Sequence, residues 1–262
     1  MDTFLETFAG RASDDSQWTF DLDERFNGAF GGTNGGVLSA ISVYVARSRS
    51  GRRAASIDSR YVRGFRPGSA RVVATPLNEG RTLTFMSVDI FDNDDRLCTH
   101  STVTLAQPSA LASELQHPGG ATPPENLSSW EQGRPWSQPK GLPEIPLIET
   151  FEPTLLGGQG VESITATKVI WQEADTHSEA ACIAADISVG PPVSRAIRGA
   201  AATPNPDLSL RFCGTSTPGD YLTASCRLER IVAGLASTRI AVWNATDLLA
   251  IGISTTTCIP IR

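Results

Sequence analysis

The chain has 262 residues, of which 40% are hydrophobic and 19% charged, and its net charge is −6. A chain of this length and composition is typical of a soluble globular protein that buries a substantial core, in one large domain or two of ordinary size. Basic residues do not cluster beyond Arg52 and Arg53, so the sequence lacks the electrostatic footprint of a nucleic-acid-binding protein.

Membrane and metal-binding classes are disfavoured as well. No apolar run reaches 18 residues, and the polar, acidic start does not resemble a signal peptide, so we expect a cytoplasmic protein with no membrane partner. The five cysteines are scattered without a CxxC pair and there are only three histidines. This pattern favours reduced thiols and predicts neither a metal site nor a cofactor.

The most informative stretch is a glycine-rich loop followed by an apolar segment. After a polar lead over residues 1–17 and a short strand at Trp18–Leu22, the loop Asp23–Gly36 contains five glycines. If the next segment, to about Arg47, is helical, only two serines interrupt its apolar surface. A helix that is apolar on nearly every face must be enclosed by other elements. A buried strand is the alternative interpretation, because valine and isoleucine are frequent there.

Strand signals follow the predicted helix. We expect strands at Ala55–Arg63, Ala70–Asn78, Thr82–Phe91 and Leu97–Ala106, with Pro67-Gly68 and the DNDD sequence at 92–95 as turns. One helix followed by four antiparallel strands forms an α+β unit.

A connector separates this unit from the rest of the chain. Residues 107–146 are rich in proline, glycine, serine and glutamine, which indicates a linker or a loop lying on a surface. Trp130 and Trp136 lie within it. We expect them to fix the connector by packing rather than to stack on a ligand.

The second part of the chain repeats the first. The expected elements are strands at Ile148–Leu155 and Ile164–Gln172, a helix at Ser178–Ile187, and strands at Ser209–Gly214, Tyr221–Ile231, Ser237–Trp243 and Leu248–Ile259. Placing Gly80 on Gly234 aligns strand, turn and strand in both parts. We therefore predict a tandem duplication, with units at 1–106 and 147–262 joined by the connector.

Four segments in this order resemble the acyl-CoA thioesterase II (TesB-like) family. They are Phe26–Gly32, Gly80–Thr82, Ala184–Asp186 and Asn205–Phe212, and the resemblance covers nearly the whole chain. Members of that family are double hotdog proteins, in which each of two units wraps a long helix in an antiparallel sheet. The resemblance implies an α+β double hotdog fold and hydrolysis of an acyl-CoA thioester by water.

The family's catalytic set is an aspartate, a threonine and a glutamine. Carried over position by position, the aspartate matches Asp186, the threonine falls on Asn205 and the glutamine falls on Ser254. Two of the three residue types therefore differ from the family pattern. That departure keeps a second hypothesis open, in which the chain is a non-catalytic protein that binds acyl thioesters.

The chemistry of Asp186 also makes it a candidate base. It lies at the C-terminal end of an apolar helix, where the helix dipole disfavours an anion and apolar neighbours raise the pKa of a carboxyl group. A solvated helix-end aspartate is the alternative. Asn205 could hold the attacking water through its amide, although it lies in a stretch of turn-forming residues, TPNPD. Ser254 could act through a second water, or be an ordinary strand serine.

The glycine-rich loop is the candidate substrate-binding element. Gly31, Gly32 and Thr33 could present backbone N–H groups to the acyl carbonyl or to a developing oxyanion. Tight turns around the helix start are the alternative, and Thr33 and Asn34 are N-cap candidates in either case. Four basic side chains could meet CoA phosphates, although surface solvation is the preferred interpretation: Arg60, Arg63, Arg66 and Arg71.

Other enzyme classes have weaker support. The chain has no GxSxG sequence, which disfavours a serine hydrolase of that type. A dehydratase with this fold would need a histidine base on the long helix, and His177, just before the second predicted helix, is the nearest candidate. Pairing of outer strands between copies could also produce a homo-oligomer.

Overall fold

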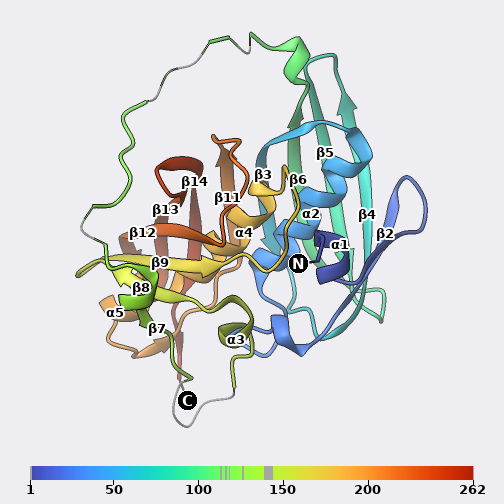
Figure 1. Cartoon of the computed structure of the whole chain (residues 1–262). Helices are drawn as coiled ribbons and strands as arrows, with labels where there is room; N and C mark the ends of the chain where they lie inside the picture. Colours follow the sequence, from blue (N-terminus) through green and yellow to red (C-terminus); the bar gives the residue numbers. More distant parts are fainter. Residues whose placement is uncertain are drawn as a thin grey trace.

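The computed structural model describes residues 2–112, 114–115, 117, 119–125, 127–138 and 144–261. Figure 1 shows two halves side by side, the N-terminal half in blue to cyan and the C-terminal half in yellow to red. No helix within these ranges is both long and apolar enough to cross a bilayer.

The first half contains two helices and six strands. Its elements are α1 (Phe4–Thr7), β1 (Gly10–Ala12), β2 (Gln17–Leu22), a 3-10 turn (Glu24–Phe26), α2 (Gly35–Ser50), β3 (Arg53–Tyr61), β4 (Gly68–Glu79), β5 (Leu83–Phe91) and β6 (Leu97–Ala106).

The connector and second half contain these elements: 3-10 turns at Pro108–Ala110 and Trp130–Gln132, β7 (Arg134–Pro135), α3 (Leu147–Phe151), β8 (Thr154–Gly157), β9 (Glu162–Lys168), α4 (His177–Ser188), α5 (Gly190–Ala196), β10 (Ala201–Ala202), β11 (Asp207–Phe212), β12 (Tyr221–Val232), β13 (Leu235–Asn244), β14 (Asp247–Thr257) and β15 (Ile259–Pro260).

The helix prediction for the apolar segment is confirmed, and the buried-strand alternative is wrong. Helix α2 begins after Asn34 and ends at Ser50, and the next residue, Gly51, adopts the left-handed conformation (φ 65°) that favours glycine at a helix C-terminus. The helix is buried on nearly all sides, including both serines, Ser39 and Ser42. A side chain on any face of this helix therefore contacts protein, as its composition requires.

One antiparallel sheet runs through both halves. The strand order is β1-β2-β4-β5-β6-β3-β11-β14-β13-β12-β9-β8-β7, and β3 pairs with β11 where the halves meet. The same strand succession leads outward from this central pair on each side. The order confirms that each half is a helix wrapped by an antiparallel sheet, and the whole is the expected α+β double hotdog fold.

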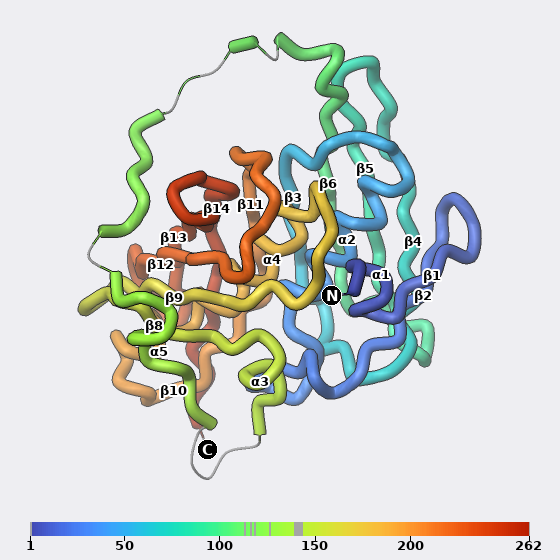
Figure 2. Tube along the Cα trace, viewed as in Figure 1, coloured from blue at the N-terminus to red at the C-terminus, as the bar shows by residue number. Residues whose placement is uncertain are grey.

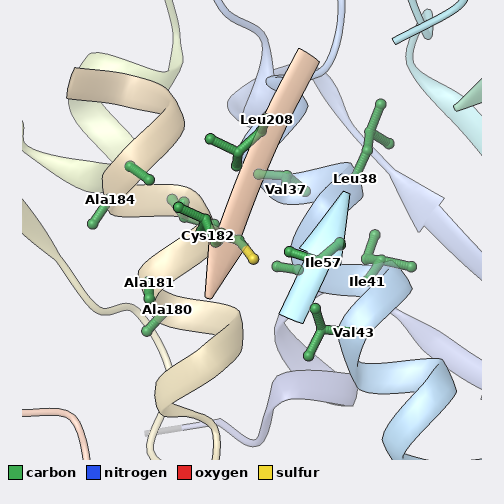
Figure 3. Close-up of a cluster of buried hydrophobic side chains, with 14 of the residues drawn as sticks. Val37, Leu38, Ile41, Val43, Ile57, Ala180, Ala181, Cys182, Ala184 and Leu208 are labelled. Carbon is green, nitrogen blue, oxygen red and sulfur yellow. The ribbon is translucent and has the colours of Figure 1, made fainter. Parts of the chain in front are cut away.

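Helices α2 and α4 lie against each other in opposite directions at the centre of the molecule. Figure 3 shows side chains of both helices meeting Ile57 of β3 and Leu208 of β11. The closest approach is at Gly36, where an added Cβ would lie 2.7 Å from both the Cys182 carbonyl oxygen and the Asp186 Cβ. Glycine is required at this crossing because any side chain would push the helices apart.

Three expectations need correction. Residues 1–17 are not only a polar lead, because Phe4 in α1 and Phe8 directly after it are completely buried. The predicted strand Ile148–Leu155 is helix α3 followed by β8, and β9 ends at Lys168 instead of Gln172. Helix α5 was not expected from the sequence. These elements are short, and they are fixed by contacts with distant parts of the chain that a local pattern does not contain.

Both connector tryptophans pack against the protein, while Trp136 also borders the main cavity, so the expectation that it does not contact a ligand stays a prediction. Trp130 stacks on Tyr221 with ring centroids 3.8 Å apart, and Trp136 packs against the main core. The described parts of the connector run around the outside of the molecule (Figure 2). Residues 113, 116, 118, 126 and 139–143 of the predicted connector lie outside the described residues. Because β7 of the connector pairs with β8, the boundaries at 106 and 147 remain an interpretation.

Candidate active site

A cavity of about 1270 Å³ opens where the two halves meet. Its lining comes from the glycine-rich loop, the end of β3, helix α3, the end of α4 and the loop before β11. Much of this lining is apolar and includes Leu38, Phe65, Leu147, Ile148 and Val189. Asp186, Asn205, Gly32 and Thr33 border the same cavity, so four of the six predicted site residues share one space.

Asp186 is held by amide groups from both halves. Its side chain is almost fully buried, with the residue only 5% exposed. The Asn205 Nδ2 donates to Oδ1 at 2.5 Å, and the Asn34 Nδ2 donates to Oδ2 at 2.7 Å. Each carboxylate oxygen therefore accepts a hydrogen bond from one side-chain amide. Two amides fix the orientation of the carboxylate.

The electrostatic environment of Asp186 combines opposing effects. Burial raises the pKa of its carboxyl group above the usual value, and hydrogen bonds from Asn205, the Gly36 N–H and Asn34 lower it in part. The carboxylate also lies between the C-terminal end of α4, which disfavours an anion, and the N-terminal end of α2, which favours one. A carboxylate with a raised pKa at a cavity wall is suited to act as a base.

Asn34 contributes in a way that the sequence did not reveal. It occupies the N-cap position of α2, as expected, but its side chain makes no capping hydrogen bond. It reaches across to Asp186 of the other half instead. Its Oδ1 is buried without a hydrogen-bond partner among the described residues, as is the Thr33 hydroxyl at the same wall. Buried unpaired acceptors bordering a cavity are favourable positions for a water or a polar ligand atom.

Tyr61 is a second residue that sequence reasoning missed as part of the site. It ends β3 and lines the cavity. An added Cβ at Gly35 would lie 2.4 Å from the tyrosine ring, so glycine makes room for it. Burial, and then the nearby Asp186 charge, raise the pKa of Tyr61 well above its usual value. The tyrosine hydroxyl therefore belongs to the immediate surroundings of the carboxylate.

The glycine-rich loop lies beside the cavity in a constrained conformation. Gly31 has a φ of 74°, and an added Cβ at Gly32 would lie 2.9 Å from the Phe65 carbonyl oxygen. The N–H groups of Gly31 and Thr33 already donate to the Gly28 and Phe65 carbonyls. Gly31 borders a smaller adjoining hollow of about 570 Å³ instead of the main cavity.

Ser254 is not brought together with the other predicted residues. It is buried on β14, where its hydroxyl donates to the Asp207 carbonyl oxygen at 2.7 Å. It does not line the cavity that contains Asp186. The predicted role of Ser254 thus has no direct contact to support it.

The predicted arginines are distributed unevenly. Arg63 lines both the cavity and the hollow, and Arg66 lines the hollow. Arg60 lies 4.0 Å from the carboxylate of Asp207, and Arg71 pairs with Asp95. Three further cations, Arg134, Arg195 and Arg198, border the cavity. No cluster of His, Cys, Asp and Glu side chains suited to a metal occurs in the described part of the chain.

Comparisons with known proteins agree with this architecture. Residues 22–106 match the model of the acyl-CoA thioesterase N-terminal domain family. A search of curated proteins finds no relative of this chain.

Three similar solved structures cover nearly the full chain. A putative thioesterase from Novosphingobium aromaticivorans is 20% identical, with a TM-score of 0.81 over 95% of this chain and 98% of that one. A tesB protein of Mycobacterium avium subspecies paratuberculosis is 16% identical, with a TM-score of 0.78 over 98% of both chains. A protein with a hot dog fold from Alicyclobacillus acidocaldarius is 14% identical, with a TM-score of 0.75 over 96% of both chains.

At these identities the structural matches establish the fold, and the family model adds a sequence match over the first half. Together they confirm the resemblance to the acyl-CoA thioesterase II (TesB-like) family, with residues 22–106 of this double hotdog chain matching the acyl-CoA thioesterase N-terminal domain.

Proposed function

We propose that the protein hydrolyses acyl-CoA thioesters, with Asp186 as the base that activates water. The observation that carries this proposal is the position of Asp186: a buried carboxylate with a raised pKa, fixed by Asn34 and Asn205 at the wall of an apolar cavity. A base in this setting removes a proton from water while the surrounding protein excludes bulk solvent.

In the proposed reaction, Asp186 accepts a proton from water as the water oxygen attacks the thioester carbon. The tetrahedral intermediate then expels the CoA thiolate as the carbon–sulfur bond breaks, and the proton held by Asp186 returns to the thiolate or to solvent. Asn205 can orient the water, because its Nδ2 is committed to Asp186 and its Oδ1 remains an acceptor. The unpartnered Thr33 hydroxyl can donate to the substrate carbonyl oxygen.

The cavity accounts for both ends of such a substrate. An acyl chain is apolar and fits the wall that includes Phe65 and Leu147, whereas CoA carries phosphates that need cations. Arg63, Arg195 and Arg198 border the same cavity and can form charge-assisted hydrogen bonds with phosphate oxygens. The combination of an apolar wall and cationic border supports an amphipathic anionic substrate.

The test is a hydrolysis assay over acyl-CoAs of increasing chain length, with free CoA detected by a thiol reagent. We expect turnover in wild-type protein and its loss in Asp186→Asn. The alternative function is non-catalytic binding of acyl thioesters, which the two departures at Asn205 and Ser254 favour. Binding without turnover, unchanged in Asp186→Asn, would support that alternative and contradict hydrolysis.

Two further expectations belong with this proposal. We propose that the protein works in the cytoplasm, where its acyl-CoA substrate would be found. We also expect a homo-oligomer formed through outer strands. Light scattering at micromolar concentration checks the second expectation, and a purely monomeric protein would contradict it.

A further inference from the structure

The last part of the connector attaches to both halves beside the main cavity. On the side of the second half, β7 pairs with β8, and the Trp136 N–H donates to the carbonyl oxygen of the residue before β8 at 2.9 Å. On the side of the first half, the Leu147 N–H donates to the Asn27 carbonyl oxygen at 3.1 Å. Residues 134–138 and 145–148 are here called the strap. Because the strap is hydrogen-bonded to both halves, it is a fixed part of the cavity surroundings.

A pair of hydrogen bonds joins the two parts of the strap. The Gln138 Nε2 donates to the Ile145 carbonyl oxygen at 3.0 Å, and the Ile145 N–H donates back to the Gln138 Oε1 at 2.8 Å. The Ile148 N–H donates to the same carbonyl oxygen at 3.0 Å. The backbone of Ile145 is therefore held at two places. Three apolar strap residues border the cavity and pack with the main core: Trp136, Ile145 and Leu147.

The internal duplication shows what occupies the equivalent place in the first half. Residues 4–8 have the sequence FLETF and residues 147–151 have the sequence LIETF, and the helices α1 and α3 lie in these two segments. Phe4 is therefore the counterpart of Leu147. The Phe4 ring stacks on Tyr44 with centroids 4.5 Å apart, whereas Leu147 borders the cavity. Space that aromatic side chains fill at one end of the helix pair is cavity beside the strap at the other.

We propose that the strap is the acyl-binding wall of the cavity, and that Trp136 is a specificity-determining residue that contacts the hydrocarbon chain of the substrate. This inference deepens the proposed function, on which its catalytic meaning rests. A hydrocarbon chain beside Trp136, Ile145 and Leu147 takes the place that the aromatic cluster fills at the Tyr44 end. It also removes apolar surface of both the chain and the wall from water, which stabilises the complex.

The polarity of the strap fits one orientation of the substrate. Arg134, at the start of the strap, is exposed at the border of the cavity. Trp136 and Ile145 are partly buried, and Leu147 is buried. An acyl-CoA places its hydrocarbon chain against the buried apolar part and its phosphates near exposed cations. The acyl chain, and not the CoA moiety, therefore lies along this wall.

Trp136 can report on its own contact with a ligand. Of the five tryptophans, all of which lie in the described part of the chain, only Trp136 borders the main cavity or the adjoining hollow. Trp130, also in the connector, stacks on Tyr221 instead. Trp136 is only partly buried, so packing against the core and contact with a ligand are compatible. A fluorescence change that requires Trp136 therefore identifies a ligand at the strap.

The test uses the dodecyl thioether of CoA with bromine atoms on the outer half of the alkyl chain. The probe has no thioester to hydrolyse, and bromine quenches tryptophan fluorescence only at close range. We expect the brominated probe to quench wild-type fluorescence more than the same thioether without bromine. Trp136→Phe should abolish this difference. Trp130→Phe, the matched control within the connector, should retain it.

Calorimetry with alkyl thioethers of CoA of increasing chain length gives a second measurement. Each methylene that reaches the wall should tighten binding by up to about four-fold. Trp136→Ala removes part of the wall, so binding of the dodecyl thioether should weaken by about ten-fold while binding of the ethyl thioether stays within about two-fold. Trp130→Ala should leave the whole series within about two-fold of wild type.

Quenching that depends on Trp136, with a loss of affinity confined to long chains in Trp136→Ala, is the supporting result. No extra quenching by the brominated probe in wild type, or equal quenching in Trp136→Phe, would overturn the proposal. Equal weakening of the short and long thioethers would overturn it too, because it would show that Trp136 acts on the fold instead of on the chain.

Because the thioethers need no turnover, the two proposals can fail separately. If quenching depends on Trp136 but the wild-type protein hydrolyses no acyl-CoA, the acyl-binding wall stands and the proposed function is wrong. If the protein hydrolyses acyl-CoA but the quenching does not depend on Trp136, the proposed function stands and the acyl chain lies against another wall.

Discussion

The two ends of the central helix pair occupy equivalent places in a duplicated fold, but in the described part of the chain the main cavity lies at only one of them. Ten residues after the N-cap of α4, Thr176, lies Asp186, and ten residues after the N-cap of α2, Asn34, lies Tyr44. At the Asp186 end there is a cavity. At the Tyr44 end, Phe4 of α1 stacks on the Tyr44 ring with centroids 4.5 Å apart. A packed aromatic cluster thus fills the space that corresponds to the cavity.

Buried charge is present at both ends, which shows that it does not define the active site alone. At the Tyr44 end, Glu179 is fully buried and pairs with Arg47 at 2.7 Å. Burial raises the pKa of Glu179 to about 7 and lowers that of the neighbouring His177 to about 4. Neither residue lines the described cavities. What distinguishes Asp186 is a perturbed carboxylate together with space for a substrate.

The largest expected effect is the difference in kcat/KM between single substitutions at the two matched residues, Asp186 and Tyr44. Asp186→Asn keeps the size of the side chain but removes the base, so kcat/KM should fall by about 10²- to 10⁴-fold. Tyr44→Phe changes the equivalent position in the filled end and should leave kcat/KM within about two-fold, because surface or core changes away from the site do not alter the chemistry. Steady-state hydrolysis of the best acyl-CoA measures both.

Equal losses in the two variants would show that the ends do not differ in function. Circular dichroism of each variant provides the control for folding. Asp186→Asn should be at least as stable as wild type near neutral pH, because the fold disfavours the ionised form of this buried carboxyl group.

The short helices α1 and α3 precede the main elements of the two halves, and substitutions in them should differ in their effect on the free energy of unfolding. Phe4 of α1 is fully buried in the aromatic cluster, so Phe4→Ala should lower the free energy of unfolding by about 3–5 kcal/mol. Leu147 of α3 borders the open cavity, so Leu147→Ala should cost only about 2 kcal/mol, the low end for such a substitution. Urea denaturation measures both losses.

Leu147→Ala should also change the preferred acyl chain length, because it widens the cavity wall, whereas Phe4→Ala should not. A larger stability loss for Leu147→Ala than for Phe4→Ala would mean that the Tyr44 end is less tightly filled than its contacts indicate.

A third effect is the pH dependence of stability at the Tyr44 end. The folded state raises the pKa of Glu179 from 4.5 to about 7, which favours the protonated form. Its contribution to stability is therefore complete below pH 4.5 and is lost as the pH rises through 7, by roughly 3 kcal/mol in total. The pKa of His177 is lowered to about 4, so the folded state favours the neutral imidazole. Its contribution to folding stability is therefore complete above pH 6.5 and is lost as the pH falls through 4.

Glu179→Gln should flatten the decline between pH 4.5 and 7.5, because an amide does not titrate. Urea unfolding of wild type and variant at several pH values gives the difference. Curves that stay parallel over this range would place the titration elsewhere. The hydrolytic activity depends on Asp186 in the opposite sense: its acid limb should lie above the usual aspartate range, since the base must be ionised.

The smallest effects concern the two positions that depart from the family pattern. Asn205 contacts Asp186, so Asn205→Ala should reduce kcat/KM by about ten-fold, the value of one hydrogen bond to a charged group. Ser254 instead bonds the Asp207 carbonyl, so Ser254→Ala should change kcat/KM by less than about two-fold. The same hydrolysis assay ranks them. A larger loss for Ser254→Ala would restore Ser254 to the site.

Much of the fold was predictable because its two central helices have an unusual pattern. A segment such as Val37–Ala46, apolar on nearly every face, can only be enclosed, and alternating strands around it define the sheet. Helices α1 and α3 were missed because each is short and owes its place to the other half; the Phe4 N–H, for example, donates to Glu173 at 2.9 Å. Local sequence patterns do not carry such contacts.

The sequence predicted the site residue that a local pattern identifies. It did not predict the residues whose role depends on contacts between the two halves or between distant elements. Asp186 was found from its position at the end of an apolar helix and from the family resemblance. Asn34 was considered only as a helix cap, although its side chain binds the carboxylate of the other half. Tyr61 looked like an ordinary strand residue. Its role depends on the crossing of α2 over β3, which no spacing along the chain reveals.

The central claim is that the Asp186 end is the working site and the Tyr44 end is closed. A crystal structure with a hydrolysis-resistant acyl-CoA thioether tests it most directly. We expect one molecule per chain, with its sulfur and adjacent carbon beside Asp186 and Asn205 and its acyl chain in the cavity. A ligand bound beside Tyr44, or one whose sulfur lies far from Asp186, would contradict the account.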